Sequence, residues 1–402
     1  MLSAQNRNND VLPVGDLGIL ALPSCKTLGE KINNHIVSWR NEREHEFSHT
    51  PQFAGYAQDS YLVPLALPRF GSGEGKGQVL GSVRGDDLYL IVDVCNYSIT
   101  YTMNGRPNHM SPDDHYQDLK RIISAVGGKA RRITVIMPYL YESRQLTRAG
   151  RESLDCAMAL QELIRMGVNN IVTFDAHDDR VQNSIPLYGF ESYRTAYQFI
   201  KGIYKAAPDV DMSPEHMMVI SPDENGTKRA IYMANVLGVD MGMFYRRRDY
   251  TRVEKGVNPV VAYEFLGDEL KGRDVIILDD MISSGESVLE VAAEMKRRNA
   301  GRVFICSTFG LFTNGLKPFD DAYARGDFYA LLTTNLVYQP PELFTRSYYT
   351  GCDMSKFIAL IIDTMNHNST VSTLLDPIDR INTFLEKKGV IRNSGKKDKL
   401  MK

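Results

Sequence analysis

The sequence predicts an α/β protein in which mainly parallel sheets are flanked by helices. Short apolar runs, typical of buried strands, alternate from residue 115 onward with longer segments that carry apolar residues at helical spacing. Strands separated by helices of this length indicate parallel sheets that are covered on both faces. The chain has 402 residues, which is enough for two domains of ordinary size.

Composition narrows the class of protein. The net charge is −2 at pH 7, so nothing indicates a nucleic-acid partner held by bulk electrostatics. The five cysteines are scattered, with neither a C-x-x-C pair nor the spacing of a zinc site, which suits a reducing compartment. No apolar run is long enough to span a bilayer, and residues 1–10 are polar and unlike a signal peptide. We expect a cytoplasmic protein without a membrane or nucleic-acid partner.

The N-terminal part predicts a strand, a helix and two segments of less regular character. Residues 17–32 begin with an apolar run and continue into a plausible helix. Residues 38–60 are polar and charged, which indicates a solvated face or an inserted excursion. Residues 69–77 (Arg-Phe-Gly-Ser-Gly-Glu-Gly-Lys-Gly) resemble a phosphate loop, but the P-loop spacing fails and no Ser or Thr follows Lys76. By themselves these glycines leave open a flexible hairpin tip or a binding loop.

The remaining elements alternate regularly. Apolar residues at positions 119, 122, 123 and 126 share one helical face, which the glycines at 127 and 128 end. The predicted strands lie at residues 133–137, 171–174, 217–220, 275–278, 302–308 and 328–334. Further helices are predicted at residues 152–166, 287–298 and 357–365, and residues 221–229 open another. The two α/β parts are expected to meet near residues 183–192.

One stretch combines a strand, two acids and a small-residue turn. Residues 275–278 predict a short buried strand, which Asp279 and Asp280 follow at its carboxyl end. A Ser-Ser-Gly turn then leads into a helix, whose free N–H groups and positive dipole end suit a phosphate. The two acids suit the vicinal hydroxyls of a sugar, so the stretch predicts a ribose-phosphate site. The structural alternative is an ordinary strand–loop–helix in which Ser283 or Ser284 is the N-cap.

Other predicted strand ends also carry chemistry. Open α/β sheets bind ligands at the carboxyl ends of their strands, where Asp175, His177 and Asp223 lie. Arginine-rich segments at residues 143–151 and 245–252 indicate polyphosphate, and acids with a histidine indicate a hard cation such as Mg²⁺. Each has a structural alternative: His177 as an ordinary core histidine, Asp223 as a helix N-cap, and the arginines at 246–248 as a solvated turn.

Six segments in one order resemble motifs of the ribose-phosphate pyrophosphokinases, also called phosphoribosyl-pyrophosphate synthetases, over about residues 62–385. Residues 69–74 resemble R-F-S-D/N-G/Q-E, and this resemblance favours a binding loop over a hairpin tip. The other segments are residues 82–89 (S/N-V-R-G-x-D-V-Y), 138–145 (P-Y-F-x-Y-A-R-Q), 175–177 (D-L-H), 221–229 (S-P-D-x-G-G-x-x-R) and 279–287 (D-D-M-I-D-T-x-G-T).

The resemblance implies two phosphoribosyltransferase-type (Rossmann-like) domains, each a mainly parallel sheet flanked by helices. An N-terminal synthetase domain at 1–186, with an insertion at about 33–60, would take ATP. A C-terminal phosphoribosyltransferase-like domain at 187–390 would take ribose 5-phosphate, and residues 391–402 would form a disordered tail. The implied reaction transfers the diphosphoryl group of Mg-ATP to O1 of ribose 5-phosphate, with Mg²⁺ as cofactor. The family also implies a homo-oligomer, usually a hexamer.

The same resemblance assigns roles to individual residues. It implies ATP binding by Phe70, Ser72, Gly73, Glu74, Arg144 and Gln145, with segment 70–74 holding adenine from a neighbouring subunit. It implies ribose 5-phosphate binding by Asp223, Asp279, Asp280, Ser283, Ser284, Gly285, Glu286 and Ser287. The implied metal ligands are Asp175, His177 and Asp223, and the implied catalytic residues are Arg246, Arg248 and His177.

Departures from the motifs keep two alternatives open. Arg246 replaces a lysine of the family's catalytic loop, Ser283 replaces an aspartate, and Glu286 stands where the family usually has glycine. The Phe-Phe-Asp expected after the histidine region is missing. One alternative is a type I phosphoribosyltransferase, whose T-G-x-S/T ending residues 284–287 resemble, although it would not need the 70–74 and 144–145 motifs. The other is a non-catalytic or regulatory synthetase-like subunit.

Overall fold

Contacts within the chain define two units. The computed structural model describes residues 13–46, 56–145, 148, 150–248 and 260–390; the side chains of 44–46, 246–248 and 260–263 lie outside the description. The first unit consists of Met1–Arg194 with Asn335–Tyr338 and Asp353–Asp376. The second unit consists of Thr195–Thr334, Gln339–Cys352 and Pro377–Lys402.

The first unit contains a five-stranded parallel sheet with the strand order β1-β4-β7-β8-β9. Its strands are β1 (Leu17–Ala21), β4 (Asp87–Ile91), β7 (Arg132–Ile136), β8 (Asn170–Phe174) and β9 (Gly189–Tyr193). Two short antiparallel hairpins accompany the sheet, β2 (Leu65–Ala66) with β3 (Gln78–Val79) and β5 (Thr100–Met103) with β6 (Arg106–His109).

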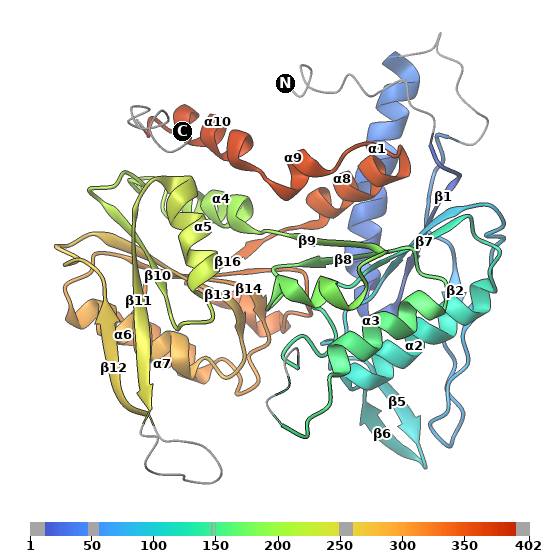
Figure 1. Cartoon of the computed structure of the whole chain (residues 1–402), viewed down its shortest axis with the longest axis horizontal. Coiled ribbons are helices and arrows are strands. Elements are labelled where there is room, and N and C mark those ends of the chain that lie inside the picture. The colour runs from blue at the N-terminus through green and yellow to red at the C-terminus, as the bar shows by residue number, and fades with distance from the viewer. Residues whose placement is uncertain (1–12, 47–55, 146–147, 149, 249–259, 391–402) are drawn as a thin grey trace. The chain divides into compact units, whose positions relative to one another are not determined.

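Helices cover both faces of this sheet. The helices α2 (Pro112–Val126) and α3 (Asp155–Arg165) share a core with the strands on one face (Figure 1). The helix α1 (Lys26–Glu46) lies on the other face, where it packs against α8 (Ser355–Asn366). The unit also contains α9 (Ser372–Leu375) and the 3-10 helices η1 (Pro23–Cys25) and η2 (Asp179–Ser184).

Local sequence explains where α2 begins and ends. The hydroxyl of Ser111 accepts from the backbone N–H of Asp114, whose carboxylate accepts from the N–H of Ser111, and Pro112 occupies the first turn. Gly127 ends the helix in the left-handed conformation, with φ +59°. The apolar residues at 119, 122, 123 and 126 are all buried, so the predicted helical face and its end are confirmed.

The second unit contains a seven-stranded sheet with the order β12-β11-β10-β13-β14-β15-β16. All neighbouring pairs are parallel except β11 with β12, which are antiparallel. The strands are β10 (Met217–Ser221), β11 (Asp240–Arg248), β12 (Val260–Leu266), β13 (Asp274–Ile282), β14 (Val303–Gly310), β15 (Ala330–Thr334) and β16 (Tyr349–Cys352).

Alternating side chains of this sheet supply two cores. On β13, Ile276 and Leu278 point to the core shared with α4 (Ala196–Ala206), α5 (Thr227–Leu237) and α10 (Ile378–Lys387). Val275 and Ile277 point to the core shared with α6 (Glu286–Arg297) and α7 (Lys317–Ala324) (Figure 1). A 3-10 helix, η3 (Pro341–Thr345), completes the unit. The predicted α/β class with mainly parallel, helix-flanked sheets is confirmed.

Some elements differ from the sequence-based expectations. Helix α1 continues to Glu46, so residues 33–46 of the expected insertion are helical; residues 47–55 lie outside the described residues, as does the tail at 391–402. The strands β11 and β12 were not predicted, and β13 extends to Ile282, so Asp279 and Asp280 lie within the strand rather than after it. The contacts divide the chain after Arg194, whereas the sequence placed a boundary after residue 186; the domain limits remain a proposal.

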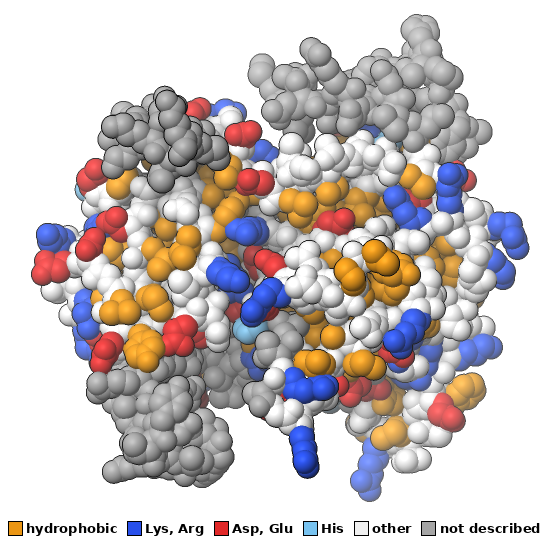
Figure 2. Space-filling view, viewed as in Figure 1, with side chains coloured by type: hydrophobic (Ala, Val, Ile, Leu, Met, Phe, Trp, Pro, Cys, Tyr) orange, Lys and Arg blue, Asp and Glu red, His pale blue; other side chains and the backbone are white. Residues whose placement is uncertain are grey.

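The surface shows mixed charge and no candidate for a membrane crossing. Figure 2 shows Lys and Arg side chains interspersed with Asp and Glu side chains over the visible face, in keeping with a net charge of −2. None of the helices in the described ranges combines the length and the apolar character that a bilayer crossing requires.

A buried charge network attaches α8 to α1. Arg40, which is 1% exposed, donates to the carboxylate of Asp363 at 3.2 Å and to the amide oxygen of Asn366 at 2.7 Å. Arg43 also donates to Asp363. The guanidinium of Arg40 lies 4.6 Å from the centroid of the Tyr56 ring. The network satisfies charges that would otherwise be buried without partners.

These charges set the ionisation of Asp363. Burial by itself would raise the pKa of Asp363, but the positive charges of Arg43 and Arg40 outweigh it and hold the pKa below its ordinary value. A carboxyl whose pKa is lower in the folded state than in the unfolded chain stabilises the fold at neutral pH and loses this contribution on acidification.

We expect Asp363→Asn to lower the free energy of unfolding by about 3 kcal/mol at pH 7, because the buried guanidinium of Arg40 and the half-buried one of Arg43 lose their counter-charge. Fluorescence of Trp39, the single tryptophan, which lies on α1, reports the transition during urea unfolding. The difference from wild type narrows as the pH falls below about 4, the ordinary pKa of an aspartate, and is lost once the folded-state carboxyl is also protonated at lower pH. Glu30→Gln, an exposed change on the same helix, serves as the control and stays within about 0.5 kcal/mol of wild type. Equal stability of the two variants would contradict the role given to Asp363.

Candidate active site

Acidic side chains gather at the carboxyl ends of β10 and β13 in the second unit. Burial raises the pKa of Asp279, and the negative charge of Asp280 raises it further, whereas Arg229 acts in the opposite direction. Arg229 pairs with Asp280 at 3.2 Å, and Asp223 also contributes to the negative field at Asp279. Asp223, Asp279 and Asp280, all predicted site residues, therefore lie close together with the positive charge of Arg229. The sequence analysis assigned Arg229 no role, although it is the final arginine of the motif at residues 221–229.

Asp223 has a structural contact as well. Its carboxylate accepts from the backbone N–H of Gly226 at 3.0 Å, and its carbonyl oxygen accepts from the hydroxyl of Ser221 at 2.7 Å. Gly226, rather than Asp223, is the N-cap of α5. The aspartate therefore shapes the turn between β10 and α5, and a ligand role for it remains a prediction.

The loop from β13 to α6 has the form of an anion cradle. Gly285 is the N-cap of α6, so neither Ser283 nor Ser284 occupies that position, although the hydroxyl of Ser284 accepts from the N–H of Glu286 at 3.5 Å. Within the described part of the chain, the backbone N–H groups of Ser284 and Gly285 have no hydrogen-bond acceptor. These donors and the positive end of the α6 dipole suit a phosphate group.

Neighbouring contacts hold this loop in shape. The carbonyl oxygen of Ser283 accepts from the N–H of Thr313 at 2.9 Å, and their hydroxyls are 3.4 Å apart. Gly285 has φ +91°, a left-handed conformation that glycine adopts without strain. A Cβ at this position would lie 2.4 Å from Cζ of Phe319. Glu286 is exposed and is the first residue of α6, and Ser287 follows it in the first turn.

In the first unit, Asp175 and His177 follow β8 directly. Asp175 is buried and has φ +38°, which is unusual for a residue other than glycine, and its N–H donates to the carbonyl oxygen of Tyr193 at 2.9 Å. His177 is half-buried. Strain of this kind at a strand end is common at functional sites. The next residue, Asp178, accepts from the N–H of Arg180 and caps η2, so the stretch that lacks the Phe-Phe-Asp motif forms a short helical turn.

The described residues contain no group of three or more His, Cys, Asp or Glu side chains that could hold a metal ion. Mg²⁺ keeps several waters and binds one or two carboxylates together with substrate phosphates, so it needs few protein ligands, all of them hard oxygen donors. The carboxylates of Asp175 and Asp223 are hard oxygen donors of the required kind.

Arg144 and Gln145 lie in the segment that follows β7. Arg144 is exposed, and its charge opposes the rise in the pKa of the Cys95 thiol that burial and Asp93 cause. The side-chain amide of Gln145 donates to the carbonyl oxygen of Ser153 at 2.9 Å. Arg144 is therefore presented to solvent, whereas Gln145 also braces its own loop.

Residues 69–77, which we call the glycine turn, fold back on themselves. The N–H of Phe70 donates to the carbonyl oxygen of Glu74 at 2.7 Å, and Gly73 has φ +93°. The hydroxyl of Ser72 donates to the carboxylate of Glu74 at 2.9 Å. Phe70 is 56% exposed. The turn has hairpin geometry, and it presents an aromatic ring, a hydroxyl and a carboxylate to solvent.

The two arginines assigned to catalysis lie at the end of β11. Arg246 pairs through its backbone with Tyr263 of β12, and the register shifts between Arg247 and Arg248. The side chains of residues 246–248 and all of residues 249–259 lie outside the described residues. The catalytic roles of Arg246 and Arg248 remain predictions.

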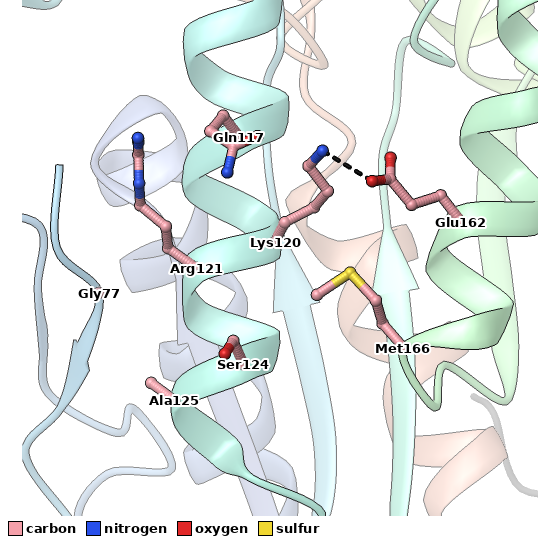
Figure 3. A pocket seen from close by; sticks show the side chains of 8 residues that line it. All are labelled: Gly77, Gln117, Lys120, Arg121, Ser124, Ala125, Glu162 and Met166. Carbon is pink, nitrogen blue, oxygen red and sulfur yellow. Dashed lines mark hydrogen bonds and ion pairs between the residues drawn. The ribbon is translucent and has the colours of Figure 1, made fainter. Parts of the chain in front are cut away.

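A surface hollow on the first unit is separate from these groups. It has a volume of about 410 Å³ and lies along α2 (Figure 3). Its cations, Lys120 and Arg121, are paired with Glu162 and Asp118. None of the predicted site residues lines it.

We expect Gly285→Ala to lower the free energy of unfolding by about 1–3 kcal/mol more than Gly315→Ala does, because only the first change forces a Cβ against Phe319. Both glycines have positive φ, and a Cβ at Gly315 meets no atom within 4 Å, so Gly315→Ala measures the backbone strain alone, about 1–2 kcal/mol. Urea unfolding followed by circular dichroism supplies the comparison. Similar losses in the two variants would show that the contact between Gly285 and Phe319 is not tight.

Two family models match the two units. The N-terminal domain of ribose phosphate pyrophosphokinase matches residues 17–167, and the phosphoribosyl transferase domain matches residues 190–326. These matches confirm the prediction of two phosphoribosyltransferase-type domains. Among solved structures, the phosphoribosylpyrophosphate synthetase from Mycobacterium smegmatis is similar in fold, with a TM-score of 0.67 and 21% identity over 88% of this chain and all of that chain.

Curated relatives carry the family assignment. The ribose-phosphate pyrophosphokinase of Vibrio parahaemolyticus is 25% identical over 335 residues, which are 81% of this chain and 96% of the relative. The ribose-phosphate pyrophosphokinase of Mycoplasma genitalium is 30% identical over 254 residues, which are 62% of this chain and 68% of the relative. Since both halves of the chain match the family's two domains and the sequence similarity extends over most of each relative, this chain belongs to the ribose-phosphate pyrophosphokinase family.

Proposed function

We propose that this chain is an enzyme that transfers the β,γ-diphosphoryl group of Mg-ATP to O1 of ribose 5-phosphate, giving phosphoribosyl pyrophosphate and AMP. The new bond joins O1 to the β-phosphorus. The bond from the β-phosphorus to the bridging oxygen of the α-phosphate breaks, so AMP leaves. The observation that carries the proposal is the carboxyl end of β13, where Asp279 and Asp280 are followed by backbone donors in the loop that leads into α6.

Ribose 5-phosphate would bind to this loop. The N–H groups of Ser284 and Gly285 would donate to the 5-phosphate, together with the hydroxyls of Ser283, Ser284 and Ser287. Asp279 and Asp280 would accept hydrogen bonds from the ribose hydroxyls, and Arg229 would keep Asp280 in place through their ion pair. The exposed side chain of Glu286 would turn to solvent, away from the phosphate dianion.

ATP would bind to residues of the first unit. Arg144 and Gln145 would contact the nucleotide, and Phe70, Ser72 and Glu74 of a neighbouring copy would hold adenine. The exposure of Phe70 supports this assignment, because an aromatic ring presented to solvent can stack on a base. Because adenine would be held by a neighbouring copy of the chain, we propose a homo-oligomer, with a hexamer as the family's usual form. We also propose a cytoplasmic location.

Magnesium would enter with ATP, with Asp175, His177 and Asp223 as its candidate contacts. The ion would neutralise phosphate charge as the diphosphoryl group is transferred. Arg246 and Arg248 would stabilise the charge of the transferring group, and His177 would contact the phosphates. Phosphoryl transfer needs little covalent help from the protein, so positioning and charge neutralisation would supply most of the rate enhancement.

Two other functions are less well supported. A phosphoribosyltransferase would use the same ribose loop, but it would not need the glycine turn or the segment at residues 138–145. A synthetase-like subunit without turnover would fit Arg246 and Ser283, which depart from the family motifs. The presence of both nucleotide segments and of the ribose loop favours the enzyme.

We expect the purified protein, incubated with Mg-ATP and ribose 5-phosphate, to release AMP and form phosphoribosyl pyrophosphate in equal amounts. Chromatographic separation of the nucleotides measures both the ATP consumed and the AMP formed. Removal of Mg²⁺ with EDTA abolishes turnover, and excess Mg²⁺ restores it. A protein that binds Mg-ATP but forms no AMP would be a non-catalytic subunit, and one that consumes phosphoribosyl pyrophosphate with a free base would be a transferase.

We expect Arg248→Ala to lower AMP formation by at least about a thousandfold while the affinity for Mg-ATP changes little, because its charge acts mainly on the transferring group. Turnover and calorimetric binding of Mg-ATP are measured on the same preparation. Arg325→Ala, a change to an exposed arginine on the second unit, is the matched control and keeps full turnover. If AMP formation survives Arg248→Ala, the catalytic assignment is wrong.

A further inference from the structure

A buried carboxylate attaches the glycine turn to α2. Asp118, on α2, is 4% exposed and accepts from two guanidinium groups, Nη2 of Arg69 at 2.8 Å and Nη1 of Arg121 at 2.6 Å. Arg69 immediately precedes Phe70, so the first contact holds the start of the turn. The side chain of Arg69 is itself 9% exposed, and its guanidinium lies 4.7 Å from the centroid of the Tyr101 ring.

The second guanidinium lies against the other end of the turn. A Cβ at Gly75 would lie 2.7 Å from Nη1 of Arg121 and 2.9 Å from Nη1 of Arg69, so both groups meet at this glycine. A Cβ at Gly77 would lie 2.7 Å from the carbonyl oxygen of Arg121. Figure 3 shows Arg121 on the side of α2 that faces Gly77, whereas Lys120 reaches the other way toward Glu162.

Like charges that lie this close need a shared counter-charge. Asp118 contacts both guanidinium groups, and charge-assisted hydrogen bonds of this kind are the strong ones. The neighbouring His115 is 2% exposed, and burial lowers its pKa, so it adds no positive charge at neutral pH; its Nε2 lies 2.8 Å from the carbonyl oxygen of Asn96. Asp114 lies one turn away and caps α2. The charge of Asp118 therefore holds the turn on the helix.

We propose that Asp118 is a positioning residue for the nucleotide, because it holds Arg69 and Arg121 against the turn that presents Phe70, Ser72 and Glu74. The inference rests on the proposed function of this turn in binding adenine. Asp118 touches no nucleotide itself. Without its charge the two guanidinium groups repel each other, and the aromatic ring at the tip of the turn loses its fixed position.

The test compares Michaelis constants for the two substrates. We expect Asp118→Asn to raise KM for Mg-ATP about tenfold, equivalent to about 1.4 kcal/mol of binding free energy, while KM for ribose 5-phosphate stays within about twofold of wild type. Asp118→Glu keeps the charge and recovers a large part of the loss. A uniform fall in kcat with both KM values unchanged would overturn the proposal, because it would indicate a general structural defect.

Asp363→Asn is the matched control. Asp363 is also a buried aspartate of the first unit that pairs with two arginines, but these arginines attach α8 to α1 and not the glycine turn. We expect Asp363→Asn to lower the unfolding temperature, as Asp118→Asn does, but to leave KM for Mg-ATP unchanged. An equal rise in KM for Mg-ATP in both variants would overturn the proposal.

Two further variants keep the outcome decisive. If Asp118→Asn does not fold, Arg69→Gln removes the contact to the turn while Asp118 keeps its bond to Arg121, and we expect the same selective rise in KM for Mg-ATP. Phe70→Ala tests the proposed function separately. If Phe70→Ala leaves KM for Mg-ATP unchanged, the turn does not bind the nucleotide; if it raises KM and neither Asp118→Asn nor Arg69→Gln does, the positioning role of Asp118 is wrong.

Discussion

The parallel direction of the strands is the constraint on which the candidate site depends. Parallel strands carry all their carboxyl ends to one edge of a sheet, and the helices that connect them begin at that same edge. In the second unit this arrangement brings Asp223 from the end of β10 close to Asp279 and Asp280 of β13, and it places the start of α6 beside them. Carboxylates and backbone donors thus arise next to each other, although their residues are separated along the chain.

Close packing at glycines gives the two proposed ligand loops their shape. The ring of Phe319 lies against Gly285, so the residue at this position must lack a side chain and must accept a left-handed backbone. In the glycine turn, a Cβ at Gly77 would meet the backbone of Arg121, and a Cβ at Gly75 would displace the guanidinium groups of Arg121 and Arg69. The glycines that resemble a phosphate loop in the sequence therefore serve a different purpose. They let a turn approach a helix closely, and this approach presents Phe70 to solvent.

The departures from the family motifs concern charge more than shape. Ser283 removes a carboxylate from the ribose loop, and Arg229 already neutralises part of the charge of Asp280. Burial and the charge of Asp280 still raise the pKa of Asp279. Arg246 keeps a positive charge where the family has lysine, but it spreads that charge over a planar group. We expect these changes to alter how strongly a transferring diphosphoryl group is stabilised, rather than the class of ligand.

The sequence by itself determined the α/β class, many of the strands and helices, although not β4, β9 or β16, and the turn at residues 283–285. Apolar periodicity, capping residues and glycine positions are local signals, and the buried face of α2 follows from them directly. Local signals did not predict the pairing of β11 with β12. They also did not predict the length of α1, because its polar residues suggest a solvated segment although Arg40 makes buried contacts with Asp363 and Asn366. Only the tertiary structure decided that Arg229 pairs with Asp280 and that Asp118 joins Arg69 to Arg121. Such partnerships depend on which residues burial brings together, and sequence separation carries no information about them.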